Sequence, residues 1–555
     1  MAENITATST ARSSAVMAAG TLASRLLGVV RTALLAVAIG STGRVTDLFS
    51  AANVLPNFIY LMVAGGVFNA VLVPQIIKAS KRPDRGRDFV SRILTLSLVF
   101  LAVITLLITL AAPLILPLVT RFDPEQLPLA TTFAYWLFPQ IFFYGAYAVI
   151  GQILNANARF GAYMWAPVLN NIVSIAGLLL FIAVIGREEA QGFSPENWSG
   201  TATLILAGST TLGIAAQALI LLVPLKRLGL GLRPSLKLRG AGLGQAAKVA
   251  RWTIITMLVG NGSYLVYTNV ATAASRARAS YLAMDPPQVI AGHLNLETAS
   301  MLYIIPHSVI TLSVATVLFN HMSHAFAEKD LAAVRRTLSG GLRSIGVATV
   351  FAAAVLVVLA GPISMWFSGG SNASAAVQAQ VLVVLAVSAP FLSATFLMNR
   401  AFYANDDAKT PLIMQLILSA FGIGLALAAS MLPANRIVLG LAVAYSLGNV
   451  AAVVLSHIFL TRKLGSYGAA RTVDVHLRLA VAALGSAAAG AAVLALLGGY
   501  SADGYAWQSM TSSVVVIAAC GLVMAAVYYV GLRLLKVREL DTFLAPLLAR
   551  VRRGA

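Results

Sequence analysis

Long apolar runs alternate with short polar segments along nearly the whole chain. A run of about 20 apolar residues is long enough to cross the hydrocarbon core of a bilayer as a helix. The pattern therefore predicts an all-α polytopic membrane protein with fourteen spanning helices. Their expected positions are 14–40, 50–78, 90–118, 128–156, 162–186, 201–225, 250–275, 298–322, 344–367, 376–404, 411–432, 436–461, 476–499 and 509–535.

Composition agrees with this pattern. The 555 residues are 59% hydrophobic and 10% charged, and the mean hydropathy is +0.85, well outside the range of soluble domains. The segments between the apolar runs are too short for a soluble catalytic domain, and the sequence contains no G-x-x-x-x-G-K-[ST] phosphate loop. These features favour a transporter over an enzyme and argue against direct coupling to ATP within this chain.

Cysteine and histidine give no sign of a disulfide or a metal cofactor. Cys520 is the single cysteine, and the six histidines show no metal-ligand spacing. Residues 1–20 lack the uninterrupted apolar core and small-residue cleavage site of a secretory signal, so we expect the first helix to stay as an anchor.

The net charge of +20 could indicate a nucleic-acid partner, but the basic residues lie mostly in the loops between apolar runs. If the N-terminus is cytoplasmic, 31 of the 39 Lys and Arg residues fall on the cytoplasmic side and six on the other. This asymmetry predicts that both termini are cytoplasmic, and the basic surplus then needs no nucleic-acid partner. The basic run at 78–92 either binds anionic lipid headgroups or only sets this topology.

The chain also repeats itself. "LPNFIYLMVAGGVFN" around Pro56 matches "IPHSVITLSVATVLFN" around Pro306, 250 residues later, and Ala156-Asn157 matches Ala404-Asn405 at an offset of 248. Two nearly equal offsets indicate one duplication of six helices, which gives two lobes in parallel orientation plus two C-terminal helices. The expected divisions are a tail (1–13), an N-lobe (14–228), a basic linker (229–249), a C-lobe (250–463), helices thirteen and fourteen (464–537) and a basic tail (538–555).

Two arginines lie within the first apolar run. Placing a guanidinium at membrane depth costs at least ~2.5 to 3.5 kcal/mol, so such residues usually face a polar cavity or an anionic partner. Arg25 has an alternative, because its side chain could reach the cytoplasmic headgroups. Arg31 lies six residues further in, about 9 Å along a helix. We therefore expect an anionic substrate, with Arg31 as the stronger candidate for binding it.

Other polar residues and prolines mark further candidates. Asp47 precedes the second helix and either caps it or gates the outer side of a cavity. Pro56 and Pro306 are expected to kink helices at matching positions, which points to a central site where the halves meet. Asn57 and His307 follow these prolines, although a neutral imidazole bonded between helices is the commoner role for a histidine such as His307.

Four stretches taken together resemble the MurJ (MviN) family of bacterial lipid II flippases, in the multidrug/oligosaccharidyl-lipid/polysaccharide exporter superfamily. They are "ASRLLGVVRTALLAVAIGSTGRVTDLFSAANVLPNFIY" (23–60), "GQILNANARFGAYMWAPVLNNI" (151–172), "IPHSVITLSVATVLFNHMS" (305–323) and "RAFYANDDAKTP" (400–411). The resemblance implies a V-shaped transporter that moves undecaprenyl-diphosphate-linked lipid II outward by alternating access. It also implies functional roles for Arg25, Arg31 and Asp47.

This chain departs from the family pattern near Tyr60 and Met301, where that pattern has basic residues. Asn57, His307 and Arg400 are the expected substitutes in substrate binding. No carboxylate lies deep in a predicted helix, so the membrane potential is the expected driving force, with a sodium site of carbonyl and hydroxyl oxygens as the alternative.

Several alternatives to the flippase stay open at this stage. They are another exporter of the superfamily, for polysaccharide lipids or drugs, a membrane enzyme acting on polyprenyl-phosphate sugars, and a non-transporting cell-wall scaffold. The expected partners are lipid II, anionic membrane lipids and proteins of cell-wall synthesis or division.

Overall fold

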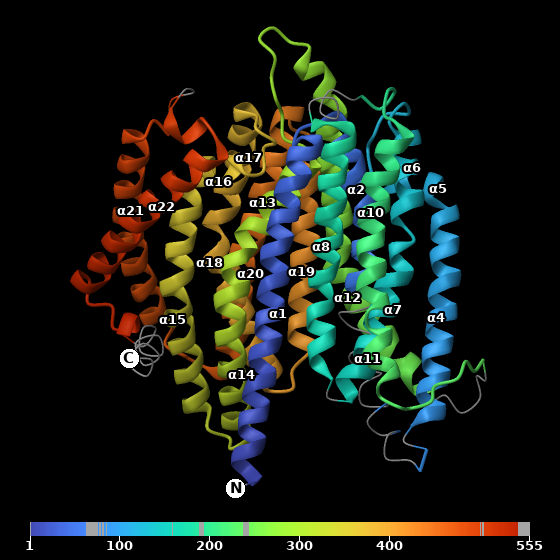
Figure 1. Ribbon diagram of the computed structural model, residues 1–555. Helices are drawn as coiled ribbons and strands as arrows, with labels where there is room; N and C mark the ends of the chain where they lie inside the picture. Colours follow the sequence, from blue (N-terminus) through green and yellow to red (C-terminus); the bar gives the residue numbers. More distant parts are fainter. Residues whose placement is uncertain are drawn as a thin grey trace. The chain divides into compact units, whose positions relative to one another are not determined.

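The structure is a computed structural model in which residues 2–62, 76, 79, 83–84, 86–157, 159–187, 194–236, 243–499, 501 and 504–541 are described. Every regular element in these ranges is helical, as predicted (Figure 1). Four of the six basic residues in the run at 78–92, those at positions 78, 81, 82 and 85, lie outside the described residues. Two polar residues of the expected second helix, Asn69 and Gln75, also lie outside them.

Contacts divide the chain into two compact units, residues 1–279 and 280–555. The first unit holds α1 (Ala2–Ile39), α2 (Arg44–Met62), α4 (Arg87–Leu110), α5 (Ala112–Val119), α6 (Leu127–Leu137), α7 (Gln140–Ala156), α8 (Phe160–Ile185), α10 (Gly200–Leu219), α11 (Leu222–Lys226) and most of α12 (Leu243–Leu282). The division falls near the end of α12, whereas the sequence predicted a C-lobe beginning at residue 250.

The second unit holds α13 (His293–Pro306), a π-helical turn η2 (His307–Thr311), α14 (Leu312–Ala327), α15 (Leu331–Val358), α16 (Ala360–Met365), α17 (Asn372–Val387), α18 (Ala389–Ala404), α19 (Lys409–Ala429), α20 (Ala434–Leu464), α21 (Ala469–Leu496), a 3₁₀ turn η3 (Tyr505–Trp507) and α22 (Met510–Leu534). The expected break at Pro433 separates α19 from α20.

Within the described ranges, eleven spans are long and apolar enough to cross a membrane, and a bent pair raises the number to twelve. The predicted count of fourteen is not reached. The expected second helix continues past Met62 into residues outside the described ranges, and the expected seventh, part of α12, is not among the twelve. The bent pair, His293–Thr311 and Val314–Ala327, is the predicted eighth helix, and its two parts meet at 47° beyond Pro306.

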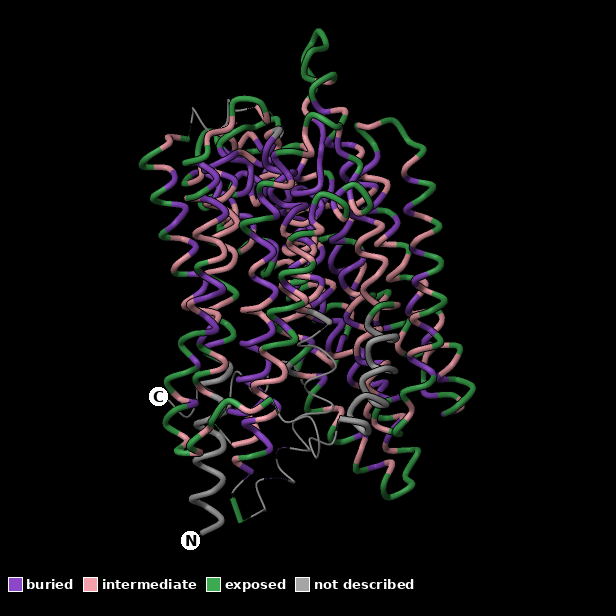
Figure 2. The backbone as a smooth tube through the Cα atoms, turned by 90° about the vertical axis from the view of Figure 1, so that its right-hand side faces the viewer, coloured by how far each residue is buried: buried purple, intermediate pink, exposed green. Residues whose placement is uncertain are grey.

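The surface of these helices suits a lipid environment. Many large apolar side chains are exposed along them, including Leu118 (78%), Leu484 (71%) and Leu522 (73%). Figure 2 shows buried and exposed residues alternating along the helices. In water such extended apolar exposure would be a strong liability, so these faces are expected to contact hydrocarbon.

The structure repeats as the sequence does. α7 ends at Asn157 with φ −100° and ψ 20°, and α18 ends at Asn405 with φ −100° and ψ 24°. The helices that precede these ends agree as well, because α6 and α7 together form one candidate span, Leu127–Ala156, as α17 and α18 do over Asn372–Ala404. Within each unit, α2 packs on α7 and α13 packs on α18. α18 therefore ends with the same backbone geometry as α7, and it packs on α13 as α7 packs on α2.

Candidate functional site

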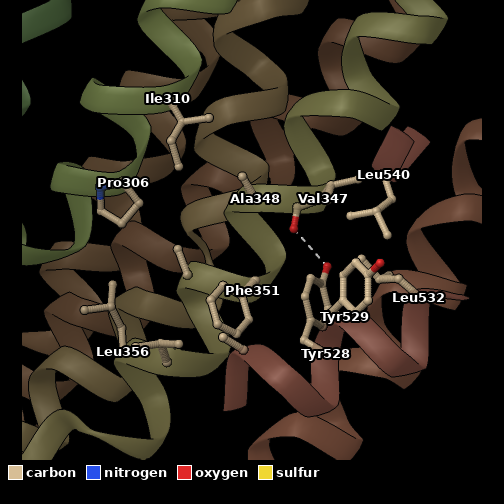
Figure 3. Close-up of a pocket in the computed structure, with 13 residues that line it drawn as sticks. Pro306, Ile310, Val347, Ala348, Phe351, Leu356, Tyr528, Tyr529, Leu532 and Leu540 are labelled. Carbon is tan, nitrogen blue, oxygen red and sulfur yellow. Dashed lines mark hydrogen bonds between the residues drawn. The ribbon is translucent and has the colours of Figure 1, made fainter. Parts of the chain in front are cut away.

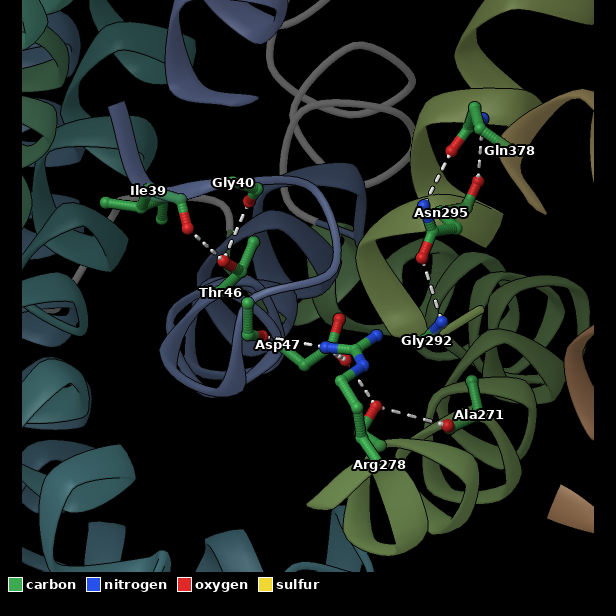
Figure 4. Close-up of polar contacts among 11 residues, drawn as sticks. Ile39, Gly40, Thr46, Asp47, Ala271, Arg278, Gly292, Asn295 and Gln378 are labelled. Atoms are coloured by element: carbon green, nitrogen blue, oxygen red, sulfur yellow. Dashed lines mark hydrogen bonds and ion pairs between the residues drawn. The ribbon is translucent and has the colours of Figure 1, made fainter. Parts of the chain in front are cut away.

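Three groups of polar side chains lie on the helices that carry the predicted residues. The first surrounds Asp47, in the first turn of α2. Its Oδ2 lies 2.9 Å from Nη1 of Arg278 and accepts a hydrogen bond of 2.5 Å from the Ser275 hydroxyl (Figure 4). Arg278 also donates to the Gly43 carbonyl at 2.7 Å. The side chains of Asp47 and Arg278 are 1% and 2% exposed, so Asp47 forms a buried ion pair and does more than cap α2.

The turn between α1 and α2 is itself closed by Thr46. Its hydroxyl donates to the carbonyl oxygens of Ile39 and Gly40, at 2.9 and 2.8 Å. The carbonyl oxygen of Gly43 and the carboxylate of Asp47 are therefore held in place to receive Arg278.

A second turn of the first unit binds α12 in the same region. Arg276 pairs with Asp123 at 2.6 Å, and Nε of Arg121 donates to the Asn269 side chain at 2.8 Å. The backbone amide of Arg121 donates to the Thr272 hydroxyl at 2.9 Å. The C-terminal half of α12 is thus fastened by polar contacts to the turns that precede α2 and α6.

The second group, here called the Arg31 cluster, contains Arg31, Asn57, Tyr60 and Tyr144. The Tyr144 hydroxyl donates to Oδ1 of Asn57 at 3.2 Å, and the Asn57 amide donates to the Asn53 carbonyl at 3.0 Å. Arg31 acts electrostatically on Tyr144. Asn57, predicted from the sequence, is therefore bonded to a tyrosine that lies within electrostatic range of Arg31.

Tyr60 extends this cluster into a stack of aromatic rings. Its ring lies 4.5 Å from that of Tyr144 and 6.5 Å from that of Tyr147, which in turn stacks on Tyr163 at 4.7 Å. The position near which the family pattern has a basic residue is thus occupied by a tyrosine that stacks on Tyr144.

Arg25 does not join the Arg31 cluster. Its side chain is exposed on α1, and among the described residues no ion pair binds it or Arg31. The neighbouring Ser24 carbonyl accepts from the Asn171 side chain at 2.8 Å, which is the interhelical packing expected of that asparagine.

The third group, the Arg400 cluster, lies in the second unit. Nδ1 of His307 is 3.1 Å from the Ser393 hydroxyl, and its ring meets the Phe396 ring edge-on at 5.1 Å. The Arg400 guanidinium lies over Phe396 at 4.8 Å and near Phe319 at 5.7 Å. Cation–π contacts hold the guanidinium without neutralising its charge, so it remains able to bind an anion.

The two clusters occupy equivalent places in the repeat. Asn57 follows Pro56, as His307 follows Pro306, and Tyr144 precedes Ser393 by 249 residues. The bond between Tyr144 and Asn57 and the contact between Ser393 and His307 are therefore counterparts. The repeat offset is the sequence signal that could have pointed to Tyr144 and Ser393, whereas Arg278 carried none beyond its position in an external loop.

The described residues contain no group of three or more His, Cys, Asp or Glu side chains that could hold a metal ion. Their clusters instead offer guanidinium, hydroxyl, amide and aromatic groups. Such groups bind phosphates and neutral polar groups by charge-assisted and ordinary hydrogen bonds.

Comparison with known proteins agrees with this chemistry. The family model described as lipid II flippase MurJ matches residues 35–528. A probable lipid II flippase MurJ from Rhizobium meliloti is 27% identical over 425 residues, covering 74% of each chain. One from Haemophilus influenzae is 26% identical and covers 77% of this chain and 82% of its own.

Solved structures share the fold. A lipid II flippase MurJ in an inward closed conformation superposes with a TM-score of 0.69 at 18% identity, covering 96% of this chain and 99% of its own. An inward-facing multidrug resistance MATE family transporter of the MOP superfamily gives 0.61 at 16% identity, covering 80% and 95%. Because its model matches nearly the whole length, the chain belongs to the lipid II flippase MurJ family.

Proposed function

We propose that this protein is a lipid II flippase that moves the undecaprenyl-diphosphate-linked peptidoglycan precursor from the inner to the outer leaflet by alternating access. The observation that supports the proposal is Arg31, a guanidinium on a membrane helix within electrostatic range of Tyr144, which bonds to Asn57, in a chain that belongs to this family. The same membership supports a transporter, rather than an enzyme, in the bacterial inner membrane.

In this proposal the diphosphate binds at the Arg31 cluster. Arg31 supplies the positive charge, while Asn57 and Tyr144 supply hydrogen-bonding groups at fixed positions. Arg25 attracts the diphosphate at the cytoplasmic headgroups, and Arg400 with His307 forms a second station in the other unit. The two stations would compensate for the basic residues missing near Tyr60 and Met301.

The buried pair of Asp47 and Arg278 acts as the outer gate. Both side chains are almost fully removed from solvent, so they can separate only if each gains water or another partner. Opening the α1–α2 turn away from α12 would expose both groups together. Release of the substrate on the outer side therefore requires the α1–α2 turn to separate from α12.

The lipid tail binds in an apolar cavity of about 400 Å³ in the second unit (Figure 3). Its walls come from η2, from one face of α15 and from α22, with Pro306 at one edge. The lining is almost entirely apolar, which suits a polyprenyl chain. Pro306 lines this cavity and directly precedes His307 of the Arg400 cluster.

Both termini are cytoplasmic in this proposal, and the inside-negative potential drives the diphosphate outward. Sodium remains an alternative source of coupling. Anionic lipids would bind the basic loops, and proteins of cell-wall synthesis or division would receive the exported precursor.

The test is flipping of fluorescent lipid II by the purified protein in proteoliposomes. We expect lipid II in the inner leaflet to become accessible to an external reagent only when the protein is present. The same proteoliposome assay is repeated with undecaprenyl-linked polysaccharide precursors and with a cationic drug in place of lipid II. Transport of those compounds but not lipid II would indicate another exporter of the superfamily, and transport of none would indicate a scaffold.

A further inference from the structure

The chain reverses direction just after α22. Lys536 has φ +55°, the Val537 amide donates to the Leu532 carbonyl at 3.0 Å, and the Lys536 amide donates to the Arg533 carbonyl at 3.2 Å. These two bonds form a Schellman motif, which ends a helix and turns the chain back. Residues 535–541, here called the C-terminal turn, therefore return along the helix bundle.

Two apolar residues of the C-terminal turn are buried in the second unit. Val537 and Leu540 are each 5% exposed and pack in a cluster with Val347 of α15 and Tyr528 and Leu532 of α22. Leu540 also lines the apolar cavity, at the end marked by Val347 (Figure 3). The turn thus supplies a wall of the cavity proposed to hold the lipid tail.

An ion pair fixes the C-terminal turn to α15. Nε of Arg343 lies 2.7 Å from Oε1 of Glu539, and the two side chains are only 14% and 13% exposed. Arg343 also donates to the Ser339 hydroxyl at 2.8 Å, which lies 3.2 Å from the Thr472 hydroxyl of α21. The same guanidinium therefore connects α15 with the turn and, through Ser339, with α21.

A second ion pair in this region provides a comparison. Arg533 pairs with Asp541 at 2.8 Å, but these side chains are 47% and 63% exposed. Exposed pairs contribute little, whereas removing one partner of a buried pair leaves an uncompensated charge. The position of Leu540 is therefore expected to depend on Glu539 far more than on Asp541.

We propose that the C-terminal turn closes one end of the tail-binding cavity and that the Arg343–Glu539 pair is the positioning element that holds Leu540 there. This inference rests on the proposed lipid II flippase function. The cavity extends along α15 from Val347 to Leu356, about 13.5 Å at the helical rise per residue. A closed end at Val347 means that the tail must enter from the side or from the Leu356 end.

The test uses the full chain in proteoliposomes with a polyprenyl diphosphate that carries a photoreactive diazirine in its tail. Cross-linked peptides are quantified by mass spectrometry. We expect the wild-type protein to cross-link at cavity residues of α15 and α22. Glu539→Gln should lower that yield about threefold or more, because the loosened wall no longer confines the tail. Asp541→Asn is the matched control and should leave the yield unchanged.

Exchange of the two charges, Arg343→Glu with Glu539→Arg, should restore cross-linking at the cavity, which a purely structural loss at Glu539 does not predict. If Glu539→Gln does not fold, Leu540→Ala tests the wall directly and should lower the yield as well. Unchanged cavity cross-linking in Glu539→Gln or Leu540→Ala overturns the inference. Wild-type protein that flips lipid II yet cross-links elsewhere also overturns it but leaves the flippase intact. Cavity cross-linking without flipping instead contradicts the proposed function.

Discussion

The guanidinium of Arg31 has no ion-pair partner among the described residues. Asn57 and Tyr144 offer hydrogen bonds but no negative charge. A charge that the protein has not neutralised is available to an anionic ligand.

Replacing Arg31 should therefore reduce transport strongly. A charge-assisted hydrogen bond contributes roughly 1.5–3 kcal/mol, which corresponds to about 10- to 100-fold in affinity. We expect Arg31→Ala to lose lipid II flipping by at least that factor while membrane insertion stays normal. Arg31→Lys keeps the charge and should retain part of the activity. Normal flipping by Arg31→Ala would contradict a diphosphate site at this residue.

Tyr144 should matter through its hydroxyl. Tyr144→Phe keeps the ring stacked on Tyr60 but removes the hydrogen bond to Asn57, an interaction with a net value of about 1 kcal/mol. We expect roughly a fivefold weaker binding of lipid II, measured by titration in detergent, with little change in melting temperature. Tyr147→Phe, which removes a hydroxyl that donates to the Tyr163 carbonyl, serves as the control.

At the scale of elements, α12 is held to the turns of the first unit by charged groups. The Asp47–Arg278 pair is the most buried of these contacts, and removing one partner of such a pair costs about 3–5 kcal/mol. Asp47→Asn should therefore loosen the α1–α2 turn from α12.

Accessibility of Ser41 can report this loosening. Ser41 is 2% exposed in the same turn, and the single native cysteine, Cys520, is buried and can be replaced by serine. In that background we expect Ser41→Cys to react slowly with an impermeant maleimide and at least about tenfold faster when Asp47→Asn is added. Equal rates with and without Asp47→Asn would show that the pair does not restrain the turn.

The loop between α18 and α19 should respond to acid. Burial raises the pKa of Asp407, but hydrogen bonds from Lys463 and Thr410 outweigh it and lower the pKa to about 2. The carboxylate therefore stabilises the fold above its ordinary pKa, near 4, and loses this effect as pH falls toward 2. The melting temperature of wild type should exceed that of Asp407→Asn from pH 8 to pH 5, and the gap should shrink below pH 4.

At the scale of the whole molecule, the direction of transport should depend on the membrane potential. A diphosphate with two charges moving across about 100 mV gains roughly 4.6 kcal/mol when the inside is negative. Collapsing the potential with valinomycin and potassium should therefore slow outward flipping in proteoliposomes. A sodium gradient imposed without a potential is the control, and full activity under that condition alone would favour sodium coupling.

The sequence was sufficient for the fold class because hydrophobic runs and repeat offsets are encoded locally. The repeat offset predicted the matched helix ends at Asn157 and Asn405, and the local sequence predicted the break at Pro433. The full count of fourteen spans is not confirmed, since α12 carries too many polar residues to count as an apolar span and the predicted second helix, 50–78, includes residues outside the described ranges.

The partners of the candidate residues were harder to predict. Asp47 could be recognised as unusual, but its partner Arg278 lies 231 positions away, and nothing in either local pattern links the two. Cation–π contacts such as Arg400 with Phe396 depend on ring orientation, which helical spacing alone does not fix. Long-range pairs of this kind arise only from tertiary packing.

The equivalence of the Asn57–Tyr144 and His307–Ser393 contacts has a consequence for mutagenesis. Both residues of the pair differ between the two copies, yet a polar contact joins the corresponding helices in each. The two members of a pair are therefore expected to depend on each other. Asn57→His alone should be poorly tolerated, because only one member of the pair is changed to its counterpart. Asn57→His together with Tyr144→Ser should preserve the contact and give the first unit the pair found in the second.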